Sequence, residues 1–475
     1  MQTLQQQWFG NVRGDVLSGI VVALALIPEA IAFSIIAGVD PMVGLYASFS
    51  IAIIIAFVGG RPGMISAATG AMALVMVNLV ADHGLQYLLA ATILTGIIQV
   101  ILGYLRIANL MRFIPNSVMI GFVNSLAILI FMAQVPHFLG ENILTYVFIG
   151  VTLVIVYVLP RYITAIPAPL IAIVLLTTIA LVMDINMKTI GDLGTITQSL
   201  PHFFIPDVPL NMETLAIIFP YALALAVVGL LESLMTAQIV DDMTVTKSNK
   251  SKEARGQGIA NMITGFFGGM AGCAMIGQSM INVKSGGRGR LSTLVAGVFL
   301  MFLILVLGNV VVDIPMPVLI GIMIMVSIGT FDWKSFKYLV TAPRTDAIVM
   351  LTTVIVVLYT HNLAIGVVLG VILSALFFVA SISKVKIHQD NNLFIIEGPL
   401  FFASTQKFMQ QMEQINQENI IIDLSSSHLW DESAVGALLK VVTKLEEKGT
   451  HVNVIGMNPA SQTLYQRLVN AHEIT

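Results

Sequence analysis

Charged residues and cysteine are scarce in this sequence. Only 10% of its 475 residues are Asp, Glu, Lys or Arg, whereas an ordinary soluble domain carries about 25%. With 57% apolar residues, the composition predicts a polytopic membrane protein surrounded by lipid. A single cysteine, Cys273, excludes an internal disulfide and a cysteine-rich metal site. The net charge of -3 gives no basis for binding nucleic acid.

Histidine is also sparse, and a signal-peptide pattern is missing. The 8 His residues lie mostly at the ends of apolar segments or near the C-terminus, without the spacing of metal ligands. We therefore expect neither an enzyme nor a cofactor. The N-terminal stretch MQTLQQQWFGNVRGDVLSG lacks the basic start and cleavage site of a signal peptide, so we expect the first span to be retained.

Fourteen apolar segments are present, and they predict an α-helical polytopic membrane protein with seven plus seven spans. They lie near residues 16–37, 42–58, 68–80, 85–105, 113–133, 143–159, 168–183, 215–240, 256–271, 275–283, 292–312, 316–329, 346–360 and 363–382. Because seven is odd, the second set must enter the membrane from the opposite side, which makes it an inverted repeat.

Basic residues in the loops predict the orientation. Of the 23 Lys and Arg residues, 17 lie in loops on one side, with Lys386 the last of them, only Lys188 lies on the other side, and five follow Lys386 in the C-terminal domain. Basic residues collect on the cytoplasmic side of a membrane protein. Both termini are therefore predicted to face the cytoplasm, with the chain in the plasma membrane.

Two of the apolar segments are too short to cross a membrane as helices. About ten apolar residues follow Gly70 in the first, and the second, GFFGGMAGCAMIGQSMINV, breaks at glycines and resumes for about eight residues. Each is third in its set of seven, and such a pair of short, glycine-interrupted segments indicates a transporter site between inverted repeats. The alternative is that the glycines only permit tight helix packing.

Each short segment would begin as a half-helix within the membrane. A helix start carries free backbone N–H groups and a partial positive charge, so it can hold a small anion without a buried arginine. The predicted anion-binding residues are Thr69, Gly70, Ala71, Ala274, Met275 and Ile276.

Two carboxylates fall inside apolar segments. Glu232 lies in FPYALALAVVGLLESLMTAQIVDD, with Thr236 one turn further along the same face, and Glu29 follows Pro28 in the first span. Ionisable residues at this depth usually mark an ion or substrate path, so Glu232, Thr236 and Glu29 are predicted to bind the coupling ion. Alternatively, Glu232 is structural, and a protonated Glu29 bonds the carbonyl that Pro28 leaves free.

Three stretches in chain order resemble the SulP family, which comprises sulfate permeases, cyanobacterial bicarbonate transporters and animal anion exchangers. The run LIPEAIAFSIIAGVDPMVGLYASF resembles the family signature, ATGAM at 68–72 is similar to its PTGPM, and NVKSGGRGRLS at 282–292 is similar to its N-x-Q-x-GGRT/S region. The resemblance implies a core of spans 1–4 and 8–11 and a gate of spans 5–7 and 12–14. It also implies a homodimer and movement of the core like an elevator.

The resemblance further implies secondary active transport of an anion of the sulfate or bicarbonate class. Glu232 and Thr236 fall where bicarbonate-transporting members place an acidic residue and a threonine around sodium. The acidic residue here is Glu rather than Asp, and a carboxylate removed from water can take up a proton, so both H+ and Na+ stay open as the coupling ion. An uncoupled channel, an exchanger and a dicarboxylate transporter also stay open.

After a predicted transmembrane domain over residues 1–384, the composition changes. Residues 385–475 predict a compact cytoplasmic α/β domain, with strands in VKIHQDNNLFIIEG, ENIIIDLSSSHLW and HVNVIGMN and a helix in SAVGALLKVVTKLEEKG. IIDLSSSHLWDESAVGALL resembles the centre of a STAS domain, whose serine at the position of Ser433 is phosphorylated in anti-sigma antagonists. Because Glu432 and Ala434 interrupt that motif, a structural role is favoured over a phosphoswitch, and a cytoplasmic regulator stays open.

Overall fold

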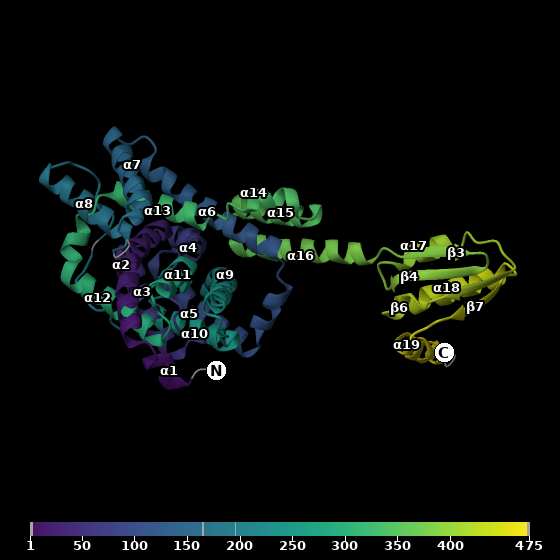
Figure 1. Cartoon of the computed structure of the whole chain (residues 1–475). Coiled ribbons are helices and arrows are strands. Elements are labelled where there is room, and N and C mark those ends of the chain that lie inside the picture. The colour runs from purple at the N-terminus through teal and green to yellow at the C-terminus, as the bar shows by residue number, and fades with distance from the viewer. Residues whose placement is uncertain (1–2, 164–165, 195, 473–475) are drawn as a thin grey trace. The chain divides into compact units, whose positions relative to one another are not determined.

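The computed structural model describes residues 3–163, 166–194 and 196–472. The chain forms two compact units, Met1–Val371 and Ile372–Thr475 (Figure 1). The first is helical apart from one short β-ribbon, and the second combines a sheet with helices. The predicted fold class, a helical membrane protein followed by a small α/β domain, is confirmed.

Helices form at every predicted apolar segment. They are α2 (Val12–Ala37), α3 (Pro41–Val58), α4 (Gly70–His83), α5 (Leu85–Tyr104), α6 (Asn116–Phe138), α7 (Ile143–Val158), α8 (Ala168–Val182), α9 (Met212–Thr244), α10 (Lys250–Phe266), α11 (Ile276–Lys284), α12 (Arg290–Val312), α13 (Met316–Thr330), α15 (Arg344–Thr360) and α16 (Leu363–Ile382). Within the described residues, 9 helices are long and apolar enough to cross a membrane. The half-helices α4 and α11 have only 14 and 9 residues.

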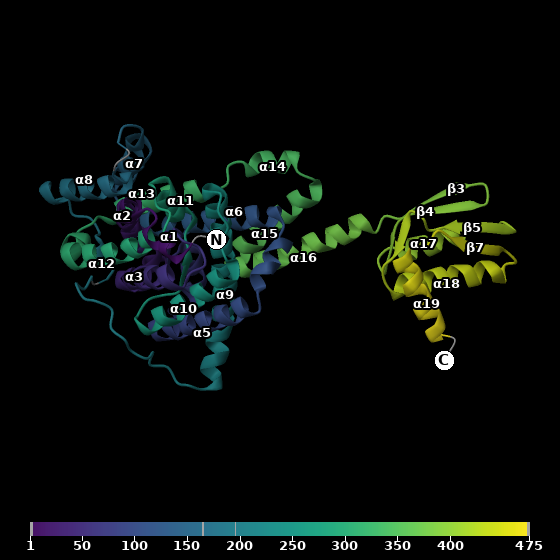
Figure 2. The ribbon, with the colours of Figure 1, turned by 60° about the horizontal axis from the view of Figure 1, so that its bottom comes forward.

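The helices of the first unit pack as two groups. In the first helix group, α2 to α5 pack against α9 to α12, with α10 against α5 and α12 against α2 and α3. In the second helix group, α6 to α8 pack with α13, α15 and α16, and Figure 2 shows α15 and α16 beside α6. Each group therefore combines elements from both halves of the chain.

A three-residue β-ribbon joins the two halves of the chain inside the first helix group. The strand β1 (Ser66–Ala68) pairs antiparallel with β2 (Gly272–Ala274). Each strand leads directly into a half-helix, β1 into α4 and β2 into α11. Backbone groups at membrane depth have no water to bond, so an irregular stretch there must find partners within the protein. The ribbon supplies those partners ahead of each half-helix.

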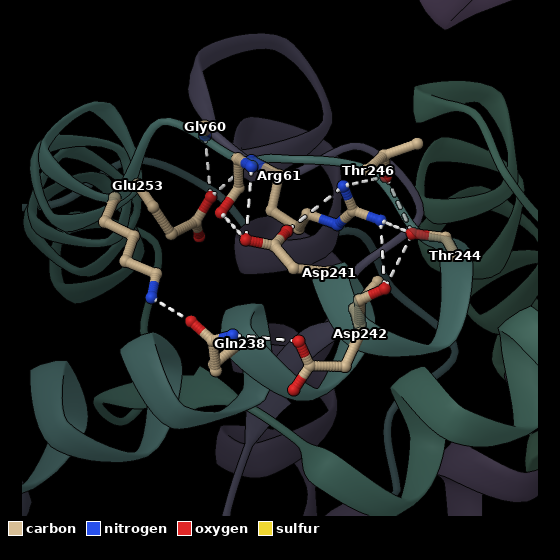
Figure 3. A network of polar contacts seen from close by, with 11 residues as sticks. Gly60, Arg61, Gln238, Asp241, Asp242, Thr244, Thr246 and Glu253 are labelled. Atoms are coloured by element: carbon tan, nitrogen blue, oxygen red, sulfur yellow. Dashed lines mark hydrogen bonds and ion pairs between the residues drawn. The ribbon is translucent and has the colours of Figure 1, made fainter.

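A polar network around Arg61 ties the end of α3 to α9 and α10 (Figure 3). The guanidinium of Arg61 lies 3.2 Å from the carboxylate of Asp241 and donates to the Thr246 hydroxyl at 2.7 Å. The backbone N–H of Arg61 donates to the buried carboxylate of Glu253 at 2.9 Å. These contacts hold α3, α9 and α10 together at one end of the first helix group.

We expect Arg61→Ala to destabilise the membrane unit by about 3–5 kcal/mol, because Asp241 would stay largely buried without its cation. The apparent melting temperature of the purified protein would measure the loss. Lys188→Ala is the matched control, since Lys188 pairs with Glu141 at 2.7 Å but is 68% exposed, and an exposed pair contributes about 1 kcal/mol or less. Equal losses in both variants would contradict a stabilising role for the Arg61 network.

The second unit is a mixed sheet with three helices. Its strands are β3 (Lys386–Asp390), β4 (Leu393–Leu400), β5 (Asn419–Asp423), β6 (Ser427–Leu429) and β7 (His451–Ile455), and its helices are α17 (Thr405–Met412), α18 (Glu432–Glu447) and α19 (Pro459–His472). The order is β3-β4-β5-β7, with β6 paired to β4. Only the β3–β4 pair is antiparallel. Its core is a cluster of apolar side chains from the sheet, α17 and α18.

Several elements of this unit differ from the prediction. VKIHQDNNLFIIEG is a hairpin and not one strand, with Asn391 at φ 53° in the turn, a backbone region that Asn tolerates better than most residues. ENIIIDLSSSHLW is divided between β5 and β6, and α17 and α19 were not predicted. Asp431 caps α18 by accepting from the Ala434 N–H at 2.9 Å, which is a structural role.

Candidate functional site

A cavity of about 100 Å³ lies between the half-helix starts and the second helix group. This space holds a few water molecules or one small anion. The first helix group contributes Glu29, Phe33, Thr69, Gly70, Ala71, Glu232, Met275, Ile276, Gly277 and Gln278, and the second contributes Phe122, Val123, Leu126, Ile130, Val326 and Thr330. Among these lining residues there is no lysine or arginine.

The start of α4 is held in place by Thr69 and Gly70. Thr69 has extended backbone geometry, and its hydroxyl accepts from the Met72 N–H at 3.4 Å. A Cβ at Gly70 would come within 2.9 Å of the Phe33 ring, so glycine allows this close approach. The first N–H groups of a helix have no partner within it, and those of Gly70 and Ala71 belong to residues that line the cavity.

The start of α11 is more open. Met275 precedes the helix, and no side chain caps this start, since thioether sulfur is a poor acceptor. The N–H of Met275 donates to the Ile65 carbonyl at 2.9 Å, next to the ribbon. A Cβ at Gly277 would meet nothing within 4 Å, so this position faces open space. The first N–H groups of a helix have no partner within it, so the backbone donors of Ile276 and Gly277, which both line the cavity, are available to a ligand.

Three side chains form a hydrogen-bonded chain from the carboxylate to the α4 start. The thiol of Cys273 donates to Glu232 Oε2 at 2.9 Å. Its Sγ lies 3.1 Å from the hydroxyl oxygen of Thr69, and either atom of that pair can donate. In the sequence, Cys273 served only to exclude a disulfide and a cysteine-rich metal site. Its place in the sequence, two residues before the predicted helix start at Met275, is the signal that could have found it.

Glu29 on α2 also lines the cavity. The helix α2 continues through Pro28, and the Glu29 carboxyl hydrogen-bonds the side chain of Gln278 on α11. Gln278 is buried, and its Oε1 has no hydrogen-bond partner among the described residues. The structure therefore brings both predicted carboxylates, Glu29 and Glu232, to the same cavity.

Two predicted site residues lie outside the cavity lining. The Thr236 hydroxyl donates to the Glu232 carbonyl at 2.7 Å, within α9. The Ala274 N–H donates to the Ser233 hydroxyl at 3.0 Å, as part of the ribbon. Thr236 and Glu232 are close in the helix, but their side-chain oxygens are not brought together. Within the part of the chain that the structure describes, no group of three or more His, Cys, Asp or Glu residues is placed to hold a metal ion.

The other predicted residues all line the cavity: Thr69, Gly70, Ala71, Met275, Ile276, Glu29 and Glu232. Free N–H groups, one hydroxyl and two carboxyls thus converge on a space of small-anion size. This arrangement can bind an anion on the helix starts and a proton or cation on the carboxylates.

Comparison with known proteins gives matches over nearly the whole chain. The profile of the Sulfate permease family matches residues 12–147 and 141–353, and that of the STAS domain matches residues 383–475. "Putative sulfate transporter YbaR" of Bacillus subtilis (strain 168) is 63% identical over 475 residues, which cover 98% of this chain and 99% of that protein.

Solved structures show the same fold. The transmembrane domain of a cyanobacterium bicarbonate transporter, BicA, is 27% identical, with a TM-score of 0.68 over 77% of this chain and 98% of that one. The murine Slc26a9 anion transporter in the inward-facing state has a TM-score of 0.82 over 97% of this chain and 88% of that one. At 18% identity, the second likeness concerns the fold alone.

Proposed function

Because the chain belongs to the sulfate permease family and is an anion transporter of that family, we propose that it moves a small inorganic anion by cation-coupled symport. The substrate class is sulfate or bicarbonate, since one relative is named a putative sulfate transporter and another a bicarbonate transporter. The observation that supports this most is the small cavity between two half-helix starts, with Glu232 and Glu29 in its walls.

The charge content of the cavity favours coupling. An anion held by helix starts has no lysine or arginine beside it among the lining residues. Ionised Glu29 and Glu232 would repel that anion strongly across a small, water-poor space. A proton or Na+ at these carboxylates removes the repulsion, so anion and cation bind best together. Because Thr236 is not among the residues that line the cavity, we favour the proton.

The division of the walls supports an elevator mechanism. The first helix group, our proposed core, supplies both half-helix starts and the carboxylates, whereas α6 of the second group supplies apolar side chains such as Phe122 and Ile130. A core that carries its ligand can slide along such an apolar wall without breaking polar contacts. We also propose a transmembrane domain to residue 384, a homodimer, and a plasma-membrane location with cytoplasmic termini, from the family resemblance and the loop charges.

Uptake into proteoliposomes tests this function directly. Labelled sulfate and labelled bicarbonate are supplied separately, each with an imposed proton gradient, an imposed sodium gradient, or neither. We expect one anion to accumulate above equilibrium only with the proton gradient. Liposomes without protein give the background, and an excess of unlabelled dicarboxylate tests the third substrate class. Equilibration without any gradient would favour a channel or an exchanger instead.

A further inference from the structure

We propose that Cys273 is a positioning residue that relays the protonation state of Glu232 to the hydroxyl of Thr69, and so sets whether Thr69 can donate to the anion. The inference rests on the proposed function and deepens it, because it names how proton and anion binding reinforce each other. It is carried by the chain of contacts from Glu232 through Cys273 to Thr69.

With Glu232 ionised, the directions of the hydrogen bonds are fixed. A carboxylate only accepts, so the thiol hydrogen of Cys273 must point to Glu232 Oε2, as the 2.9 Å contact has it. A thiol has one hydrogen, and its sulfur can then only accept from Thr69 at 3.1 Å. The Thr69 hydroxyl hydrogen is therefore directed at sulfur and away from the cavity. In this state the α4 start offers the anion only backbone donors.

Protonation of Glu232 reverses the chain. The new O–H of Glu232 donates to the sulfur, the S–H turns to Thr69, and the Thr69 O–H is released to donate to the anion. The Thr69 oxygen then accepts from both the S–H and the Met72 N–H, which its two lone pairs allow. One proton enters from water onto Glu232, and none leaves the thiol or the hydroxyl.

The surroundings of Cys273 favour such a relay. Its side chain is 0% exposed, so water does not compete for its hydrogen bonds. One titratable side chain contacts Glu232, namely Cys273 on β2, and Glu29 on α2 lines the same cavity. Other ionisable groups on the helices packed against α9 lie toward helix ends: Asp82 and His83 on α4, Tyr87 and Tyr104 on α5, Lys284 on α11, and Lys250, Lys252, Glu253 and Arg255 on α10. Glu253 is already engaged by the N–H groups of Gly60 and Arg61.

Anion binding as a function of pH tests the relay in the full-length protein. The probe is labelled sulfate, or labelled bicarbonate at a fixed bicarbonate concentration, whichever the wild type accumulates. We expect the gain in affinity on acidification to be about tenfold smaller in Cys273→Ala, since one hydrogen bond to a charged group is lost. Cys273→Ser should keep most of the gain, because a hydroxyl can both donate and accept. Ser233→Ala perturbs the same ribbon outside the relay and should keep the whole gain.

A double-mutant cycle separates the relay from packing. Thr69→Val removes the hydroxyl while keeping the shape of the side chain, and it should lose the same factor as Cys273→Ala. The double variant should lose little more than either single variant, because both remove one chain of hydrogen bonds. Additive losses would overturn the relay.

Infrared spectroscopy gives a readout that packing would not change. The chain has one cysteine, so its S–H stretching band belongs to Cys273. A hydrogen bond to a carboxylate is stronger than one to a hydroxyl, so the band should move to higher frequency when Glu232 is protonated. A band that stays fixed across the pH range, or a Cys273→Ala protein with the full affinity gain, would overturn the relay while leaving anion transport standing. Absence of any anion binding by the wild type would instead overturn the proposed function.

Discussion

Glu232→Gln is expected to abolish accumulation of the anion against its gradient, while downhill exchange of the anion persists. Gln has nearly the same shape as Glu and stays neutral. Its amide can still hydrogen-bond Cys273, whose Sγ lies 2.9 Å from Glu232 Oε2 in the wild-type protein. The variant cannot bind and release the coupling proton at residue 232. The imposed proton gradient therefore no longer favours one conformational state of the transporter over the other. In proteoliposomes, the ratio of internal to external labelled anion should fall to about 1.

Thr236→Ala is the matched control for this prediction. Thr236 lies on the same helix face, but its hydroxyl donates to the Glu232 carbonyl and lies outside the cavity lining. We expect its accumulation ratio to stay within about twofold of wild type, since an intrahelical bond of this kind contributes little. A loss equal to that of Glu232→Gln would favour a sodium site that both residues share. Normal accumulation by Glu232→Gln would contradict the coupling role of this carboxylate.

Gly277→Leu is expected to weaken anion binding strongly, with little effect on folding. A Cβ at Gly277 meets no atom within 4 Å, so the new side chain extends into a cavity of only about 100 Å³. Overfilling of a packed site typically costs about 1–3 kcal/mol, so anion affinity and uptake should fall by up to about 100-fold. Equilibrium binding and initial uptake rates of the same labelled anion would measure this.

Gly150→Leu on α7 controls for the substitution itself. A Cβ at Gly150 also meets nothing within 4 Å, and Gly150 lies outside the cavity lining. Both changes replace a helical glycine, so both should favour the helix by a similar amount. We expect Gly150→Leu to bind and transport the anion like wild type. Similar losses in the two variants, or full binding by Gly277→Leu, would place the anion elsewhere.

The helical framework could be predicted from the sequence because apolar runs of fixed length are a strong signal. The short segments were equally informative, since their length alone requires half-helices that begin inside the membrane. Those starts fixed Thr69, Gly70 and Met275 as candidates, and all three line the cavity. Glu29 and Glu232 stood out because carboxylates are costly at that depth.

What could not be predicted depends on contacts between distant segments or on the direction of one hydrogen bond. The pairing of β1 with β2 joins residues from different halves, and a three-residue strand leaves no periodic pattern. Cys273 reaches Glu232 only through that ribbon. Thr236 was placed by helical spacing, which locates a side chain on a face but does not reveal that its hydroxyl donates to the Glu232 carbonyl of the same helix.

The β1–β2 ribbon also sets when the site can be completed during biosynthesis. Ser66 pairs with Ala274, so about 200 residues must be translated after the first strand before its partner exists. At about 5–20 residues per second, the first half-helix waits roughly 10–40 s in the translocation machinery or the bilayer with its strand unpaired. The ribbon is thus completed only after α4 to α10 have been made, and a chain truncated before residue 272 would leave the unpaired backbone of β1 for quality-control proteases to recognise.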